Sequence, residues 1–324
     1  MFIIIYENYY KNLIMPSTLT HYTFLTLVEP NISKIGFIGA QGPDPFFFNF
    51  ASLNKGKDSK KIEECGHFLH DINPIKTFLY FIKRIKESKN NKEKNALYDY
   101  LKGMTSHYAL DATTHPFIFY NSGFAITEKD NSHDFFLSHA AIESSIDRLI
   151  SDKFNINKSP SKMLSFNKKD LKVVSNVFYN YLNDEFKLDF IKNKTFYIAL
   201  KRMRFVYRII YSKHSYKKNL FRKVANNSAI NVFSTPTAKQ VLPYDFLNLN
   251  HKTYTSCVDN NKKYNFDFYQ LIDKAKDYYF VLLKEINKLI NGSTSNLSEV
   301  IDNVNHNGHK VNEVMKYYDL IWNC

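Results

Sequence analysis

Residues that break helices are rare in this chain, and this scarcity constrains its fold more than any other feature. The 324 residues include only 9 Gly and 9 Pro, whereas a protein built from many short strands needs frequent turn residues. Apolar side chains recur at helical spacing, as in Phe78, Ile82 and Ile85, where they would share one face of a helix. The sequence therefore predicts an all-α fold.

Capping residues, prolines and glycines divide the chain into expected helices. These cover about 17–28, 74–85, 93–112, 132–154, 168–183, 190–212 and 265–291, with a final helix towards Trp322. Between them, 39–50 is an expected loop, because two glycines and two prolines within seven residues are incompatible with a helix interior. The segment 54–61 is an expected solvated turn, and 227–264 is expected to be irregular.

One helical domain is expected over residues 15–324, preceded by an extension, 1–14, that does not belong to it. The extension has an apolar patch of four residues only and lacks the basic and long apolar segments of a secretory signal. Met15 precedes the first patterned segment, so we predict that translation starts there. No apolar run approaches the ~18 residues of a membrane span, and we expect a cytoplasmic protein.

Composition and charge narrow the classes of site and partner. Cys65, Cys257 and Cys324 stand far apart, which argues against a disulfide framework or a thiolate metal site. The formal charge of +13 suits an anionic partner such as phospholipid headgroups or nucleic acid. A lysine-rich solvated surface is the simpler interpretation of that charge. No segment indicates an obligate protein partner.

Two histidine–carboxylate pairs carry the chemical information. His107 and Asp111 are four residues apart, and so are His139 and Glu143. On a helix, residues at this spacing lie on one face, so an imidazole and a carboxylate would meet in one small volume. Ile146 extends the stripe of the second pair, which places a carboxylate on a face that should be buried. A metal ion would compensate the cost of burying that charge.

Other candidates have simpler interpretations beside the functional one. A single such pair is more often an ordinary hydrogen bond, and two pairs on apolar stripes indicate a metal site and ordinary hydrogen bonds about equally. His115 follows Asp111 by four residues, just before a proline. His21 alone would be a core histidine, and Asp44, between two prolines, either a turn residue or a carboxylate held by a rigid loop. His70 could belong to an ordinary helix end.

Three histidines look like surface residues, because their neighbours in the sequence are polar. They are His214, His306 and His309.

Five stretches resemble the zinc-dependent phospholipase C family, which includes bacterial phosphatidylcholine-preferring phospholipases C and clostridial alpha-toxins. They are PSTLTHYTF (16–24), GAQGPDPFFF (39–48), GHFLHDINP (66–74), GMTSHYALDATTHPF (103–117) and SHAAIESSID (138–147). The resemblance implies an all-helical domain of the phospholipase C and single-strand nuclease type, with two or three buried zinc ions.

The resemblance also implies roles for single residues. Asp111 would bridge two metal ions, with His107 as a ligand beside it. A second ion would be held by His115 together with His139 and Glu143. We prefer His70 to His67 as the ligand from the GHFLHD stretch.

Two further positions follow from the same resemblance. His21 would bind the third ion, and Asp44 would be a ligand or the general base. In the secreted toxins a free N-terminal amine completes the third site. Removal of Met15 would expose the amine of Pro16 for that purpose, whereas retention of residues 1–14 would leave the ligand missing.

The implied function is that of a phospholipase C-like hydrolase, in which zinc-activated water attacks a phospholipid headgroup or another phosphodiester. Phe46 to Phe48 could form an apolar wall for a lipid, although packing in the core is the ordinary role of such residues. The basic, aromatic stretch 201–223 fits an anionic membrane surface or nucleic acid equally well. The alternatives are therefore a nuclease of the same fold, or a non-catalytic protein stabilised by a metal ion.

Overall fold

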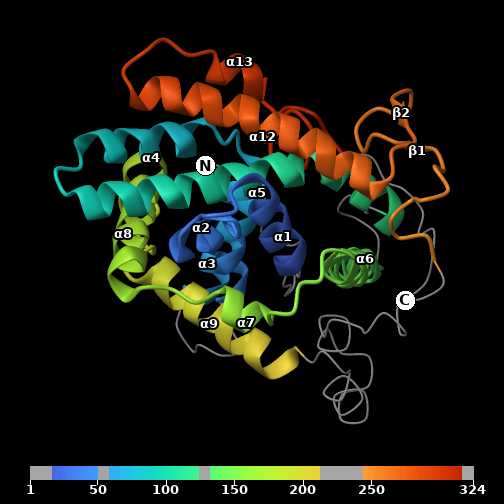
Figure 1. Ribbon diagram of the computed structural model, residues 1–324, viewed down its shortest axis with the longest axis horizontal. Helices are drawn as coiled ribbons and strands as arrows, with labels where there is room; N and C mark the ends of the chain where they lie inside the picture. The colour runs from blue at the N-terminus through green and yellow to red at the C-terminus, as the bar shows by residue number, and fades with distance from the viewer. Residues whose placement is uncertain (1–16, 50–57, 124–131, 212–243, 316–324) are drawn as a thin grey trace.

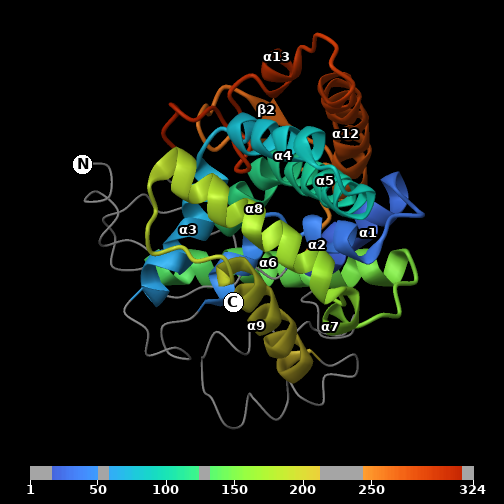
Figure 2. The same ribbon diagram turned by 90° about the vertical axis from the view of Figure 1, so that its left-hand side faces the viewer.

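The computed structural model describes residues 17–49, 58–123, 132–211 and 244–315, and over these residues the chain is mostly helical (Figures 1 and 2). The elements are α1 (Thr18–Val28), α2 (Lys34–Gly39), the 3₁₀ helix η2 (Asp44–Phe48), α3 (Ser59–Asp71), α4 (Ile75–Glu87), α5 (Asn91–Ser122), α6 (Ser132–Lys153), α7 (Pro160–Met163), α8 (Lys168–Phe186), α9 (Thr195–Ile210), β1 (Tyr254–Thr255), β2 (Lys263–Tyr264), α12 (Phe268–Ile290) and α13 (Leu297–Ile301). The two short strands pair antiparallel. The all-α prediction is confirmed.

Helix α5 passes through the interior of this arrangement (Figure 1). It packs against α2 and α12 most extensively, and also against α1, α4, α6 and α8. Glycines permit the closest of these approaches, since a Cβ on Gly103 would lie 2.0 Å from the carbonyl oxygen of Gly36. A helix buried on several sides can present polar residues to the centre of the molecule, and α5 does so.

Helix α5 is longer than predicted. The expected helix ended near residue 112, before Pro116, but α5 continues to Ser122. Proline has no N–H to donate to the carbonyl of Ala112. The residues around it, including His115 and Phe117, are nonetheless buried, and their packing maintains the helix. As a result His107, Asp111 and His115 occupy one face at four-residue intervals.

Three other segments differ from expectation. The expected loop 39–50 contains η2, because prolines near the start of a short 3₁₀ helix supply a compatible φ angle. Helix α3 begins at Ser59, inside the expected turn. After α12 only the short α13 follows, before a series of turns up to residue 315; Trp322 and the extension 1–14 lie outside the described residues.

The start of α1 is determined by a distant residue. Ser17 precedes the helix, but its side chain makes no capping hydrogen bond. Instead the Asp147 carboxylate, from α6, accepts hydrogen bonds from the backbone N–H groups of Leu19 (3.0 Å) and Thr20 (2.8 Å), and from the Thr20 hydroxyl (2.5 Å). A carboxylate at a helix N-terminus satisfies unpaired N–H groups and complements the helix dipole.

Phe46, Phe47 and Phe48 are each 0% exposed. Packing in the core is therefore their role, as the simpler interpretation of this run held. None of the helices within the described ranges is long and apolar enough to cross a membrane.

Candidate metal centre

Buried imidazoles and carboxylates converge around α5 in three groups. In each group one ligand atom from every residue lies within 4.8 Å of the others. All eight residues that we predicted as metal ligands belong to these groups, and all eight are buried. The groups are His21, His107 and Asp111; Asp44, His70 and His107; and His115, His139 and Glu143.

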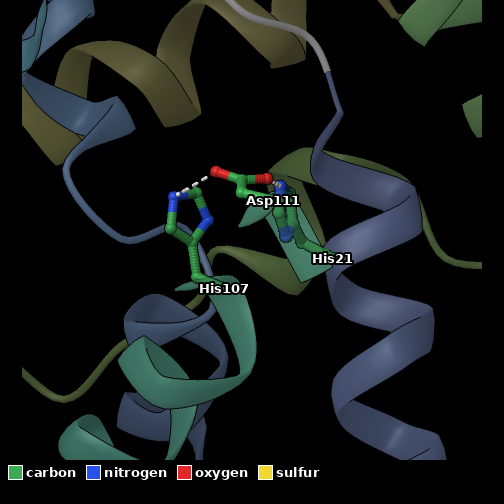
Figure 3. A group of neighbouring side chains, drawn as sticks. All are labelled: His21, His107 and Asp111. Atoms are coloured by element: carbon green, nitrogen blue, oxygen red, sulfur yellow. Dashed lines mark ion pairs between the residues drawn. The ribbon is translucent and has the colours of Figure 1, made fainter. Parts of the chain in front are cut away.

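Asp111 lies between the imidazoles of the first two groups. Its Oδ1 is 3.2 Å from Nε2 of His21, and its Oδ2 is 3.0 Å from Nε2 of His107 (Figure 3). Nε2 of His70 lies 3.1 Å from Oδ1 of Asp44 and 3.9 Å from Oδ2 of Asp111. The two oxygens of Asp111 thus face different imidazoles, an arrangement in which one carboxylate can contact two cations.

The third group joins α5 to α6. Nε2 of His139 is 3.3 Å from Oε1 of Glu143, and Nε2 of His115 is 3.7 Å from the same oxygen. His139 and Glu143 are one helical turn apart, as their spacing predicted. His115 reaches them because α5 continues past Asp111 without a break.

Backbone carbonyls orient three of the imidazoles. Nδ1 of His70 lies 2.8 Å from the Gly66 oxygen, and Nδ1 of His107 lies 3.2 Å from the Ala40 oxygen. Nδ1 of His115 lies 2.7 Å from the His306 oxygen. A carbonyl oxygen only accepts, so in each case Nδ1 carries the hydrogen. Nε2 is then directed into the centre, as is usual for histidines that bind metals.

Several atoms in this centre are buried and have no hydrogen-bond partner among the described residues. They include Nε2 of His70, His107 and His139, Oδ1 of Asp44 and Oε2 of Glu143. Buried polar atoms are normally paired, and orphaned ones indicate a missing water or ion. Zinc is held in proteins by this combination of imidazole nitrogens and carboxylate oxygens. The residues therefore fit a zinc ion.

The pKa values of the carboxyl groups and imidazoles in this centre are shifted in different directions. Burial acts to raise the pKa of Asp111, but the imidazoles of His107, His115 and His21 hold it well below its usual range. Burial opposes a similar shift in Glu143, whose pKa is lowered to about 2 chiefly by His139. Asp111 and Glu143 are therefore ionised at neutral pH. They supply the negative charge that attracts cations.

His70 shows the opposite shift. Burial acts to lower its pKa, but the Asp44 carboxylate, helped by Asp111, raises it to about 9. Below pH 6.5, the pKa of this imidazole in the unfolded chain, the interaction contributes its full stabilisation to the folded protein. The stabilisation is lost as the pH rises through about 9, the pKa of His70 in the folded protein. At pH 7 the His70 imidazole thus holds a proton that a metal must displace.

We therefore expect zinc binding at pH 7 to release at least one proton, and zinc affinity to increase from pH 7 to about 9. Calorimetric titration in two buffers of different ionisation enthalpy measures the number of protons released. A binding enthalpy that is independent of the buffer would contradict the expectation.

His306 and His309 were expected at the surface, and this interpretation is wrong. Their exposed fractions are 5% and 8%. The His306 ring centroid lies 5.2 Å from that of His70 and 5.5 Å from that of His107. Burial, and then the neighbouring His70 and His107, hold the pKa of His306 well below its usual range. His214 lies outside the described residues, and His67 belongs to none of the three groups.

The signal that could have found His306 is weak. Its stretch, NVNHNGHK (303–310), has no helical period and is rich in Asn, which is typical of a turn. Nothing in that pattern says which part of the chain the turn contacts.

A family model described as zinc-dependent phospholipase C matches residues 37–193. No curated protein matches the chain, and no solved structure matches it. The matched range contains seven of the eight converging residues, all except His21. Residues 37–193, which carry most of the centre built around α5, are therefore similar to the zinc-dependent phospholipase C family.

Proposed function

We propose that this chain is a zinc-dependent hydrolase that cleaves a phospholipid in the manner of a phospholipase C. The observation that carries the proposal is the convergence of three groups of buried imidazoles and carboxylates around one helix. The family match supports metal-dependent chemistry of this class. Zinc would be held by His21, Asp44, His70, His107, Asp111, His115, His139 and Glu143.

The sharing of residues between groups supports two or three ions. His107 belongs to two groups, but Nε2 of an imidazole has one lone pair and binds one ion. If His107 binds the same ion as Asp44 and His70, and Asp111 bridges this ion to another, the first ion has a full set of ligands. His21 and Asp111 then remain for a third ion. That ion needs another ligand, and the amine of Pro16 is our candidate.

In the proposed reaction a water oxygen bonds to phosphorus while the bond from phosphorus to the diacylglycerol oxygen breaks, and that oxygen takes up a proton. Bound zinc would lower the pKa of water and neutralise the phosphate oxygens. Asp44 would accept the proton of the attacking water, as a general base. Its Oδ1 is buried and lies 3.1 Å from Nε2 of His70. The same oxygen could instead bind the metal.

A basic and apolar face on α9 supports contact with an anionic membrane. Phe205 is 58% exposed and Ile209 is 42% exposed, and Lys201 and Arg204 are exposed beside them. Apolar side chains can enter the headgroup region while cations contact lipid phosphates. These exposed aliphatic and aromatic groups favour lipid over nucleic acid as the partner of this face.

Metal content and turnover, measured together, test the proposal. We expect two or three zinc ions per chain by mass spectrometry of the metals. We also expect hydrolysis of phosphatidylcholine vesicles that a chelator abolishes and added zinc restores. Single-stranded DNA is the competing substrate in a parallel assay.

Each contrary outcome points to a different alternative. Chelator-sensitive cleavage of DNA alone would replace the proposal with a nuclease. Bound zinc without turnover of either substrate would indicate a metal-stabilised binding protein. No zinc after reconstitution would remove the metal assignment altogether.

A further inference from the structure

The turn formed by residues 303–310, here called the histidine loop, reaches the metal centre from outside the matched range 37–193. Its central residue, His306, makes two backbone hydrogen bonds there. The His306 N–H donates to the carbonyl of His70 (3.1 Å), and the His306 carbonyl accepts from Nδ1 of His115 (2.7 Å). His70 and His115 belong to different ligand groups. One residue of the loop thus contacts both.

Side chains hold the histidine loop against α3 and α5. Asn307 donates from Nδ2 to the Asp71 carboxylate (2.8 Å), and Asn305 donates from Nδ2 to the Asp71 carbonyl (3.3 Å). The Tyr108 hydroxyl donates to the Val304 carbonyl (2.9 Å). Asp71 directly follows His70, and Tyr108 directly follows His107. The loop is therefore attached beside the ligands themselves.

The imidazole of His306 packs among these residues without joining a ligand group. Its centroid lies between 5.2 and 5.5 Å from those of His70, His107 and Tyr108. The side chain is buried, and no group in the described part of the chain forms a hydrogen bond with its Nδ1. The ring forms one wall of the centre, while the backbone of the same residue orients ligands.

Gly308 explains why the loop can approach so closely. Its φ is +77°, and a Cβ there would lie 2.6 Å from the Ala112 carbonyl oxygen and 2.7 Å from Cδ of Pro116. Those two residues directly follow Asp111 and His115 on α5. Pro116 has no N–H for the Ala112 carbonyl, and the loop occupies the space beside that carbonyl.

We propose that the histidine loop is an integral part of the metal centre and that His306 is a positioning residue, which fixes the orientation of His115 and anchors the end of α3 that carries His70. The inference rests on the proposed function, because it assumes that these histidines bind metal. Groups that orient metal ligands typically contribute about 10–100-fold to metal affinity. A loop that contacts two ligand groups should affect both.

The test compares two glycine substitutions. Gly308→Ala places a methyl group against α5, whereas Gly292→Ala has the same kind of backbone strain, at φ +79°, with no atom within 4 Å of the added Cβ. Cobalt(II) replaces zinc as the probe, because its visible absorption reports ligand geometry. Far-UV circular dichroism confirms the fold of each variant. Asn307→Ala, which removes the bond to Asp71 without adding volume, is the second variant.

We expect Gly308→Ala to bind cobalt about 10–100-fold more weakly and with a changed visible spectrum, and Gly292→Ala to match the unaltered chain. Asn307→Ala should change the cobalt affinity and the visible spectrum in the same direction. If Gly308→Ala loses helicity, the result for Asn307→Ala alone tests the inference. Unchanged affinity and spectrum in the folded loop variants would overturn the inference. Failure of the unaltered chain to bind cobalt or zinc would instead overturn the proposed function, and this inference with it.

Discussion

Replacing Asp111 with Asn should remove metal from the first two groups and reduce hydrolysis by about 10³-fold. Asp111 is the carboxylate that faces His21, His107 and His70. Lewis-acid stabilisation of a phosphoryl transition state is worth several kcal/mol, and about 4 kcal/mol corresponds to that factor in rate. The amide keeps the shape of the side chain but removes the charge that balances the cations.

Metal content distinguishes a ligand from a folding effect in this experiment. Glu143→Gln should lose only the ion of the third group, because Glu143 contacts only His115 and His139 among the predicted ligands. Asp273→Asn, at an exposed position on α12, is the matched control and should keep the full complement. If Asp111→Asn retained as much zinc as Asp273→Asn, Asp111 would not be a ligand.

Replacing Asp147 with Ala should lower the free energy of unfolding by about 2–4 kcal/mol. It would leave the N–H groups of Leu19 and Thr20 and the Thr20 hydroxyl without their acceptor. A buried donor without a partner costs about 1–3 kcal/mol. Because His21 follows Thr20 directly, we also expect weaker metal binding at the His21 group.

Urea unfolding of the metal-free protein measures this loss. Burial raises the pKa of Asp147 to about 7, so its ionisation destabilises the folded state as the pH rises from 3.8 through about 7. The comparison is therefore made at pH 6, where the side chain of the folded protein is mostly protonated and still accepts these hydrogen bonds. Asn167→Ala is the control, since Asn167 caps α8 at an exposed position by accepting from the Lys169 N–H (2.8 Å). A cap of that kind contributes about 1 kcal/mol. Equal losses in the two variants would mean that Asp147 is only an ordinary cap.

The sequence by itself determined those features that depend on neighbours along one helix. The scarcity of Gly and Pro predicted the all-α fold, and the four-residue spacing of His107 with Asp111 and of His139 with Glu143 predicted two ligand faces. The all-α fold is confirmed, and each pair lies on one helix face, because i,i+4 geometry is a property of the helix alone. That these side chains bind metal stays a prediction. His70, and not His67, lies in a group that could hold a metal ion. The preference for His70 came from the family resemblance and not from spacing.

The tertiary structure decided how separate elements meet. Only packing could continue α5 through Pro116, because the burial of its neighbours outweighs the local preference of proline. Only packing could bring Asp147 to the start of α1 or His306 to His115, which is 191 residues away. Such contacts depend on the three-dimensional path of the chain, and no local period encodes them. The histidine–carboxylate faces are thus a property of the helices, whereas the convergence of these faces into one candidate metal centre is a property of the fold.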